Sequence, residues 1–373
     1  MVKTRNQHRA GAGSVTLLAI AALIFSLGST APAQAQSIPA ICQESSGDSG
    51  RIQVAIDRSK PGDEVVIKGG RCLITETITL RGGRSYRGES REGTVLTQAD
   101  GANLPALLAS DTWVENTPTT GAPFSLEKLT LDGNRENNPE AGDGLVIRSW
   151  NTTVEDVAVR WNTGNGITVT NLSQDGTPVR VTPESGNQVN GTIRNVFVWR
   201  SGGANIRIKD TGNTVTDWNL LDSWIAWGAK GGVLMDNAAG WRVEGNHFYG
   251  NHPSAINAER MFASSISNNY IEDFDTNGIE VTVQGVIGNT IANNRVFHLN
   301  SGTAGTYILI KRANYATGVV GVTGNVVRGN TTGTGLGYEA GSANLTVTSS
   351  GNTVVNVAKV MNVGDNVTVS EGV

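Results

Sequence analysis

The chain has 373 residues with a formal net charge of −4 at pH 7, and 47 of its residues are glycine. A general nucleic-acid binder is excluded by this charge, because such binding depends on a basic surface that neutralises phosphates. The length would allow two ordinary domains, and the many glycines suit tight, closely stacked turns.

Residues 1–35 have the features of a secretory signal. Three basic residues stand among the first nine, residues 15–27 are apolar, and residues 33–35 offer small side chains at a cleavage point. The apolar run is too short to span a membrane comfortably, so we expect no membrane association once the signal is removed. Because the signal carries three basic residues and no acid, its removal lowers the net charge from −4 to −7. We expect a secreted protein, extracellular or periplasmic, that comprises residues 36–373.

The start of the mature chain predicts a cap. Cys42 and Cys72 are the two cysteines of the chain, and in an oxidising compartment we expect them to form a disulfide. No other cysteine or nearby histidine completes a metal site around them. Residues 52–57 place apolar side chains at helical spacing before Pro61, which predicts a short amphipathic helix over the open end of the fold.

From residue 144 onward, two short sequence patterns alternate. The first is a small residue followed by apolar, any, apolar and any, which is the period of a strand with one buried face. The second is an Asn or Asp followed by a β-rich run, repeated every 22 to 39 residues. Such periods indicate stacked units, and stacked coils of strands form a solenoid with a continuous apolar interior. The first pattern occupies residues 144–148, 166–170, 205–209, 232–236, 255–259, 278–282 and 307–311. The second has its Asn or Asp at residues 156, 195, 217, 246, 269, 294, 325 and 352.

The repeated Asn and Asp suggest a family. These residues tolerate left-handed backbone angles at sharp turns, and stacked amides can hydrogen-bond from coil to coil. The pattern resembles, over residues 52–363, the right-handed parallel β-helix of the pectate-lyase-like superfamily, whose interior carries an asparagine ladder. This resemblance implies an all-β fold: a single-stranded right-handed parallel β-helix (solenoid) with a short N-terminal capping helix, as one domain over residues 36–373. It does not imply one activity, because this fold hosts many chemistries.

Two segments interrupt the pattern. Residues 111–122 predict a surface loop, and residues 171–189 form an insertion rich in Ser, Gln, Asp, Gly and Pro. Long loops on a solenoid usually lie on one face and often form the wall of a binding cleft. A decorative loop without function is the alternative for the insertion.

Outward positions of the first pattern predict the chemistry. The apolar residues point inward, so the residues between them form outward rows whose members lie about 4.8 Å apart. Asp236 and Glu259 would then be adjacent carboxylates, with Glu280 roughly 7–8 Å from Glu259. Adjacent acids destabilise a sheet surface unless something binds there, which favours a site over a solvated face with Lys209–Asp236 and Glu259–Lys311 ion pairs. One row contains Arg148, Thr170, Lys209, Asp236, Glu259, Thr282 and Lys311, and the other contains Val146, Thr168, Arg207, Leu234, Asn257, Glu280 and Leu309.

Aromatic residues and a histidine complete the expected binding surface. Trp161, Trp199 and Trp224 follow Asn or Asp positions at similar offsets. We expect an exposed aromatic stripe beside the charged rows that stacks on sugar rings, with burial under the insertion as the alternative. His252 lies in a loop before the strand of Glu259, where it is either an acid–base group or a turn residue.

Three classes of function fit these residues, each with a polysaccharide or oligosaccharide as partner. The first hypothesis is a polysaccharide lyase that cleaves a uronate-containing glycan by β-elimination. The resemblance implies proton abstraction beside a uronate carboxylate that is often held by Ca²⁺. Asp236, Glu259 and Glu280 would then ligate the ion, and Lys311 or Arg207 would be the base. The expected substrate-binding residues are Lys209, Trp161, Trp199, Trp224, Asn257, Arg312 and His252.

The second class is a glycoside hydrolase or a fructotransferase-like enzyme on the same fold. Asp236 and Glu259 would then be nucleophile and acid, without a metal. The fold also resembles that of polygalacturonases and inulin fructotransferases. The adjacent Asp-Asp pair and the Gly-His-Gly motif of polygalacturonases do not occur here, and residues 207–210 only partly match their Arg-Ile-Lys element. The third class is a non-catalytic glycan-binding β-helix.

Overall fold

The structure is a computed structural model that describes residues 35–180, 188–300, 304–312, 317–341 and 344–371. All of these residues belong to one compact unit, residues 35–373. The predicted signal, residues 1–35, lies outside the described residues except for its last position. No helix among the described residues is long and apolar enough to cross a membrane.

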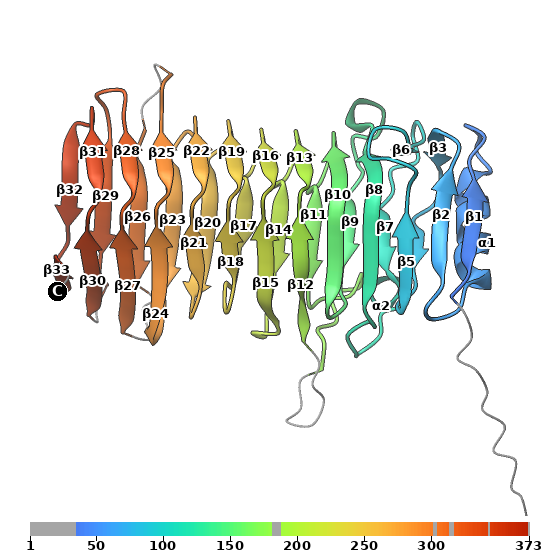
Figure 1. The fold of residues 1–373 in the computed structure, drawn as a ribbon, viewed down its shortest axis with the longest axis horizontal. Coiled ribbons are helices and arrows are strands. Elements are labelled where there is room, and N and C mark those ends of the chain that lie inside the picture. Colours follow the sequence, from blue (N-terminus) through green and yellow to red (C-terminus); the bar gives the residue numbers. More distant parts are fainter. Residues whose placement is uncertain (1–34, 181–187, 301–303, 313–316, 342–343, 372–373) are drawn as a thin grey trace, which may run out of the picture. The chain divides into compact units, whose positions relative to one another are not determined.

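The described residues form a parallel β-solenoid whose coils stack along one axis (Figure 1). A typical coil supplies three strands, and each strand pairs with the equivalent strand of the next coil. One strand of each coil joins an eleven-stranded sheet, which we call the site sheet. Its strands are β4 (Ile78–Leu80), β7 (Ala106–Ser110), β9 (Asp143–Ile147), β11 (Ile167–Thr170), β14 (Ile206–Lys209), β17 (Val233–Met235), β20 (Ser254–Met261), β23 (Asn277–Val283), β26 (Thr306–Arg312), β29 (Thr334–Glu339) and β32 (Lys359–Val363).

The other two strands of a coil join a 22-stranded sheet that bends around the solenoid, so that it has two faces. One face contains β1 (Ser37–Ile41), β2 (Glu64–Lys68), β5 (Arg84–Arg87), β8 (Phe124–Asp132), β10 (Thr152–Arg160), β12 (Val189–Arg194), β15 (Val215–Leu221), β18 (Arg242–Glu244), β21 (Ser265–Ser267), β24 (Gly285–Ala292), β27 (Gly318–Thr323), β30 (Leu345–Ser350) and β33 (Val367–Ser370). The second, which we call the aromatic face, contains β3 (Arg71–Ile74), β6 (Val95–Gln98), β13 (Phe197–Trp199), β16 (Trp224–Ala226), β19 (His247–Tyr249), β22 (Tyr270–Glu272), β25 (Arg295–Phe297), β28 (Val326–Arg328) and β31 (Thr353–Val355). The long strands β8 and β10 pair on both faces.

An apolar core runs through the solenoid, as the alternating pattern predicts. Ile206 and Ile208 on β14, for example, are buried and stack on Val233 and Met235 of β17. One contiguous cluster of buried side chains extends from the first strands to β30. Burial of these side chains supplies the main driving force for stacking the coils.

An asparagine ladder lines one corner of the coils. The side-chain amides of Asn246, Asn269, Asn294 and Asn325 are buried, and each donates to the side-chain oxygen of the next coil's Asn over 3.0 to 3.1 Å. The last acceptor in the row is Asn352. The predicted coil-to-coil amide bonds are therefore confirmed from residue 246 onward.

Three of the eight repeated Asn and Asp residues have a different role. Asp156 and Asn195 occupy the corner position one residue earlier, with left-handed φ angles of 54° and 49°. Asp217 also has a left-handed φ of 58°, but it lies within β15 rather than at that corner. Assigning these three to the ladder was wrong, because left-handed corner residues and ladder residues are adjacent in the chain and both favour Asn or Asp.

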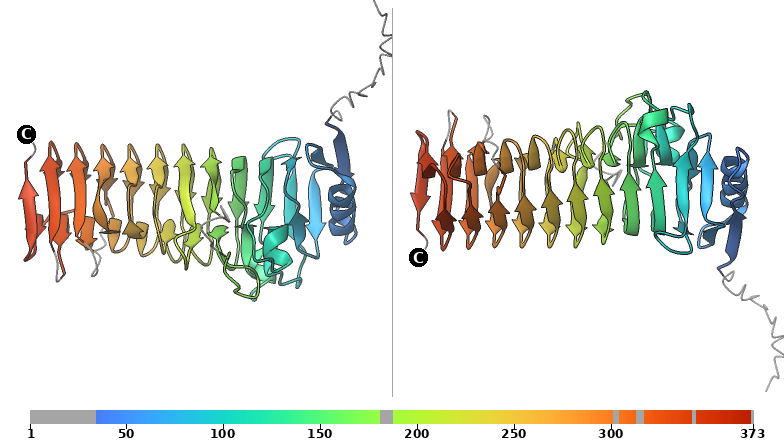
Figure 2. Two further views of the ribbon diagram at one scale, coloured as in Figure 1. Left: turned by 90° about the horizontal axis from the view of Figure 1, so that it is seen from below. Right: turned by 90° about the horizontal axis from the view of Figure 1, so that it is seen from above.

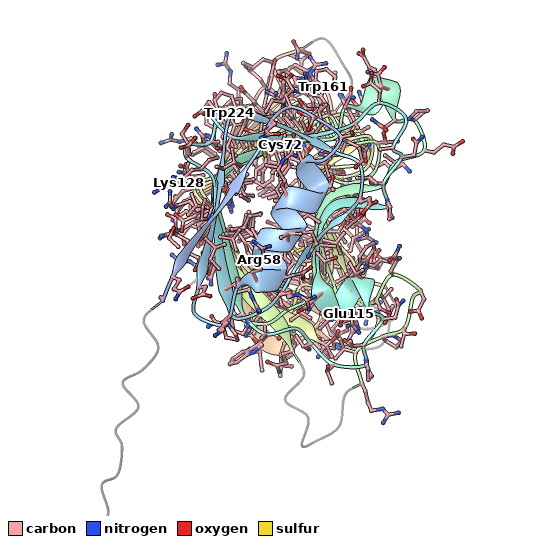
Figure 3. The ribbon with its side chains drawn as sticks, turned by 90° about the vertical axis from the view of Figure 1, so that its right-hand side faces the viewer. Arg58, Cys72, Glu115, Lys128, Trp161 and Trp224 are labelled. Atoms are coloured by element: carbon pink, nitrogen blue, oxygen red, sulfur yellow. A yellow bond between two sulfur atoms is a disulfide. The ribbon has the colours of Figure 1, made fainter. Side chains whose placement is uncertain are left out.

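The predicted N-terminal cap is present. Helix α1 (Asp48–Arg58) buries Ile52, Ala55 and Ile56 against the first strands, and Figure 3 shows it across the end of the solenoid. The disulfide between Cys42 and Cys72 joins the segment after β1 to β3, with a Cα–Cα distance of 5.1 Å. Two further short helices are α2 (Asp111–Val114) and the 3₁₀ turn η1 (Arg135–Asn137).

Replacing both cysteines with serine is expected to destabilise the cap. The disulfide closes a segment with a sequence separation of 30 residues, for which loop entropy gives about 3–4 kcal/mol. We expect faster amide hydrogen exchange in α1 of the double Ser variant, with unchanged exchange in β20 to β26. Equal exchange in α1 of the variant and the unreduced parent would contradict a stabilising role.

Candidate functional site

The second of the two predicted outward rows, which contains Arg207, Asn257 and Glu280, is present on the site sheet. Strand register places Thr168 beside Arg207, Arg207 beside Leu234, Leu234 beside Asn257, and Asn257 beside Glu280. The row ends in the pair of Glu280 and Leu309. Residues far apart in the chain therefore meet on one surface, as the repeat predicts.

Asp236 and Glu259 follow equivalent strand positions, because Met235 pairs with Ala258. Their surroundings differ. The Asp236 carboxylate accepts a hydrogen bond from Arg207 Nη2 at 2.5 Å, whereas the Glu259 side chain is exposed to solvent. Beyond Ala258 the pairing shifts, and Arg260 takes a left-handed φ of 52°.

The ion pairs on this surface are not the Lys209–Asp236 and Glu259–Lys311 pairs that a solvated face would have. Asp236 pairs with Arg207, and Glu280 pairs with Lys311 Nζ at 2.5 Å. Asn277 Nδ2 also donates to Glu280 at 2.8 Å. Both ion pairs therefore join an acid of one predicted row to a cation of the other row on a neighbouring strand.

Arg207 and Lys311 are poorly suited to act as bases. Besides Asp236, Arg207 Nη1 donates to the carbonyl oxygens of Ile208 at 2.9 Å and Leu234 at 3.1 Å. A guanidinium that donates to three oxygens offers no lone pair that could accept a proton from a substrate. Lys311 Nζ donates to the carboxylate of Glu280.

The residues expected to ligate Ca²⁺ do not form a common site. Among the described residues, no group of three His, Cys, Asp or Glu side chains could hold a metal ion. Asp236 and Glu280 each already have a cationic partner. Because Ca²⁺ needs several oxygen ligands around one point, Asp236, Glu259 and Glu280 do not fit that ion.

A cleft opens at one end of the row. It has a volume of about 390 Å³, and its floor is the outer face of β9, β11 and β14. One wall comes from α2 and the other from residues 172–176 of the insertion, and Figure 2 shows α2 and its loops as a bulge on one side of the solenoid. The lining residues are Trp113, Asp143, Val146, Asn165, Thr168, Thr170, Leu172, Ser173, Gln174, Gly176, Arg207 and Lys209.

Asp143 is the carboxylate of this cleft. It accepts hydrogen bonds from Thr168 Oγ1 at 2.6 Å, from the Asn165 backbone N–H at 2.7 Å and from Asn165 Nδ2 at 3.0 Å. Burial raises the pKa of the Asp143 carboxyl above the ordinary aspartate value, although these hydrogen bonds and the positive charge of Lys209 oppose the shift. A carboxyl with a raised pKa, fixed by neighbours in a cleft, is suited to acid–base chemistry.

Lys209 and Arg207 give the cleft its positive charge. Lys209 lies at the end of β14 with an exposed side chain, and Arg207 lies two residues earlier on the same outer face. Among the described lining residues, Asp143 is the one carboxylate and these two are the cations. The cleft therefore combines one acid–base group with one exposed cation, Lys209, and a second cation, Arg207, that is paired with Asp236.

The three predicted tryptophans lie elsewhere on the solenoid. Trp199 and Trp224 belong to β13 and β16 of the aromatic face, whereas Asp236 and Glu259 belong to the site sheet or its edge. Viewed along the axis in Figure 3, Trp161 and Trp224 lie at the top, away from Glu115, which follows α2. The expected position beside the charged rows is wrong, because each coil turns a corner between these strands.

Rings on the aromatic face pack against one another and against Arg200. Trp224 is 48% exposed but stacks on His247, with ring centroids 4.8 Å apart. The Arg200 guanidinium lies 5.0 Å from the Trp161 ring centre and 5.2 Å from that of Trp199. These contacts stabilise the coils through ring stacking and cation–π attraction.

Arg312 and His252 also depart from the expected binding surface. Arg312 is only 4% exposed, because it continues the inward phase of Ile308 and Ile310 on β26. Its assignment as a surface cation was therefore wrong. His252 lies in the turn before β20, where its Nδ1 contacts Asp275 at 2.7 Å. Asn257 is on the predicted row but outside the cleft lining.

Sequence reasoning missed Asp143, Asn165 and Trp113. Asp143 and Asn165 each stand one residue before the small residue that opens the first pattern, so they fell outside the compared positions. Asn277 occupies the same place on β23. A comparison begun one residue earlier would have detected this polar position, whereas Trp113 lies in a segment without repeat.

Fold and cleft together define a parallel β-helix protein with a polar, charged groove on one outer sheet. Residues 143–353 match the family model described as right handed beta helix region. The match covers more than half of the chain, so the chain belongs to this family. Among curated proteins, no sequence matches it.

Solved structures with the same fold are similar to this chain at low sequence identity. The A-module of the mannuronan C-5 epimerase AlgE4 of Azotobacter vinelandii is 17% identical, with a TM-score of 0.58 over 90% of this chain and 100% of that module. The Dettilon tailspike protein gp208 is 14% identical, with a TM-score of 0.56 over 87% of this chain and 64% of the tailspike. The DFA-IIIase from Arthrobacter chlorophenolicus A6 is 12% identical, with a TM-score of 0.51 over 86% of this chain and 80% of that enzyme. At these identities the similarity shows a common fold.

Proposed function

We propose that the protein is a secreted enzyme that binds a uronate-containing polysaccharide in the cleft of the site sheet and cleaves it by β-elimination. The observation that carries this proposal is the composition of the cleft, in which Asp143, with its raised pKa, lies with the cations Arg207 and Lys209. The disulfide between Cys42 and Cys72 supports an oxidising compartment such as the cell exterior.

β-Elimination needs the groups that the cleft supplies. A base removes the proton at C-5, beside the uronate carboxylate, a double bond forms between C-4 and C-5, and the C-4 oxygen leaves and takes up a proton. Lys209 would neutralise the carboxylate, which makes the C-5 proton more acidic. Asp143 would accept that proton, and Asn165 and Thr168 would hold its carboxyl in place.

Two features favour this chemistry over hydrolysis. Hydrolysis by paired carboxylates needs a second carboxyl about 5–10 Å from the first, and the described lining of the cleft contains Asp143 alone. The AlgE4 module, by its name, acts at C-5 of mannuronan, the carbon from which elimination also removes a proton. A hydrolase or transferase that uses Asp236 and Glu259 is the second candidate, because Met235 pairs with Ala258.

The first test is a substrate screen with residues 36–373. Pectate, alginate and inulin are incubated with the protein, with and without a chelator. We expect ultraviolet absorbance from unsaturated uronate with pectate or alginate and none with inulin. Reducing sugar or a cyclic disaccharide without unsaturation would favour the second candidate. Binding of the polymer without any product would favour the non-catalytic glycan-binding class.

Replacing Lys209 with Gln is expected to lower kcat/KM for the acidic polymer by about 10-fold to 100-fold, because a charge-assisted contact of about 1.5–3 kcal/mol to the uronate carboxylate is lost. Lys359→Gln, at the far end of the same sheet, is the matched control. Initial rates at several polymer concentrations give kcat and KM for the parent and for each variant. If kcat/KM falls further in Lys311→Gln than in Lys209→Gln, the substrate binds near Lys311 rather than in the cleft.

A further inference from the structure

Arg148 is a buried cation beneath the walls of the cleft. It follows β9 and continues its outward phase, yet it is 0% exposed. Helix α2 and the loop after it cover this outer face, where Ala106, Ala109 and Val146 form a small apolar cluster with Trp113. The outward direction predicted for Arg148 therefore leads into a covered interior rather than to solvent.

The guanidinium of Arg148 bonds to backbone oxygens of two separate segments. Nη1 donates to Thr112 O at 2.9 Å and Thr119 O at 3.0 Å, and Nη2 donates to Thr117 O at 2.8 Å. Nε donates to Asn171 O at 3.3 Å. Burial lowers the pKa of Arg148 to about 10, so the group remains charged at neutral pH. A planar cation with five donors can hold several carbonyl groups in one fixed geometry.

The two segments also bond directly to each other. The Gln174 backbone N–H donates to Trp113 O at 3.0 Å, and the Arg180 backbone N–H donates to Pro118 O at 2.8 Å. The Asp175 backbone N–H donates to Asn116 Oδ1 at 3.0 Å. Both walls of the cleft, Trp113 on α2 and residues 172–176, thus belong to one hydrogen-bonded unit with Arg148 beneath it.

We propose that Arg148 is a positioning residue that clamps these two segments together and so holds Trp113 and residues 172–176 as the wall of the cleft beside Asp143. It touches neither the cleft nor the reacting atoms, since it is absent from the lining. Its effect on the reaction rests on the proposed function: a sugar ring of the acidic glycan lies against this wall, and a loosened wall weakens binding without altering Asp143.

The test compares Arg148→Met with a matched control, Arg84→Met. Arg84, on β5, also donates to backbone oxygens, Gly82 O at 2.6 Å and Ser59 O at 2.8 Å, but its guanidinium bonds to neither wall segment. In Arg148→Met we expect amide exchange in residues 112–119 and 171–176 to accelerate about tenfold or more, because four hydrogen bonds to backbone oxygens are lost. In Arg84→Met these segments should exchange as in the parent.

Kinetics separate positioning from catalysis. We expect Arg148→Met to raise KM for the acidic polymer about tenfold and to change kcat by less than about threefold. Trp113→Ala, which removes one wall side chain but keeps the clasp, should raise KM with unchanged exchange at residues 171–176. Arg148→Lys, with fewer donors, should have exchange rates and a KM between those of the parent and of Arg148→Met. It is the variant to use if Arg148→Met does not fold.

Two results would overturn the inference. Unchanged exchange in both segments of Arg148→Met would show that Arg148 does not hold them. A fall in kcat equal to the fall in kcat/KM would assign Arg148 to the chemical step. If the parent binds no acidic polymer, the proposed function fails, whereas the exchange experiment still decides whether the clasp exists.

Discussion

Replacing Asp143 with Asn is expected to lower kcat/KM by about 100-fold to 10,000-fold, the range of a lost general base. Asn has nearly the same shape, and its amide can still contact Asn165 and Thr168, which bond to the carboxyl in the parent. The cleft should therefore keep its form while losing the group that takes the proton. Unsaturated product measured at saturating and at limiting polymer concentration gives both kinetic constants.

The pH profile of the parent should carry the signature of Asp143. Burial raises the pKa of this carboxyl, and a base must be deprotonated to act. We expect kcat/KM to rise with pH through this raised pKa and then to level off. A fall of kcat/KM over the same pH range would instead assign Asp143 the role of a general acid.

Stability provides a control for the same variant. Because the pKa of Asp143 is raised in the folded state, the folded protein binds this proton more tightly than the unfolded chain does. Its contribution to stability is present below the unfolded pKa and is lost as the pH rises through the folded pKa. Asp143→Asn should therefore be at least as stable as the parent at neutral pH, as judged by thermal unfolding.

Glu259→Gln distinguishes the two candidate sites. Glu259 is exposed and lies outside the cleft lining, so elimination centred on Asp143 should continue in this variant. Loss of activity in Glu259→Gln together with full activity in Asp143→Asn would reject the cleft and favour the pair of Asp236 and Glu259.

The sequence repeat correctly predicted those outward positions that recur in every coil. Alternation and spacing placed Arg207, Asn257 and Glu280 in one row, and the strand register confirms that row. Parallel stacking makes this possible, since each coil copies the phase of the previous one. Arg312 was expected on the binding surface, but it follows Ile308 and Ile310 at period two on β26, so the same alternation directs its side chain inward.

The cleft could not be predicted in the same way. Its walls come from segments that occur once, and Arg148 joins them by bonds to backbone oxygens at residues 112, 117, 119 and 171. Backbone acceptors are present at every residue, so no sequence pattern marks these contacts. The tryptophans were misplaced for a related reason: an offset along the chain does not show on which side of a corner a residue falls.

Replacing Asn294 with Ala is expected to lower the free energy of unfolding strongly. The Asn294 side chain donates to Ile266 O and to Asn325 Oδ1, each at 3.0 Å, and its oxygen accepts from the backbone N–H and the Nδ2 of Asn269. All four bonds are lost, and the partners stay buried without replacement. We expect destabilisation of at least about 3 kcal/mol, since each buried unsatisfied group costs about 1–3 kcal/mol.

The neighbouring residue supplies the matched control for this variant. Asn293 is exposed and has a left-handed φ of 56°, which glycine adopts without strain. Asn293→Gly should therefore shift the urea midpoint far less than Asn294→Ala, although the two sites are adjacent in the chain. If both variants unfold at the same urea concentration, the buried amide of Asn294 contributes no more to stability than an exposed corner residue does.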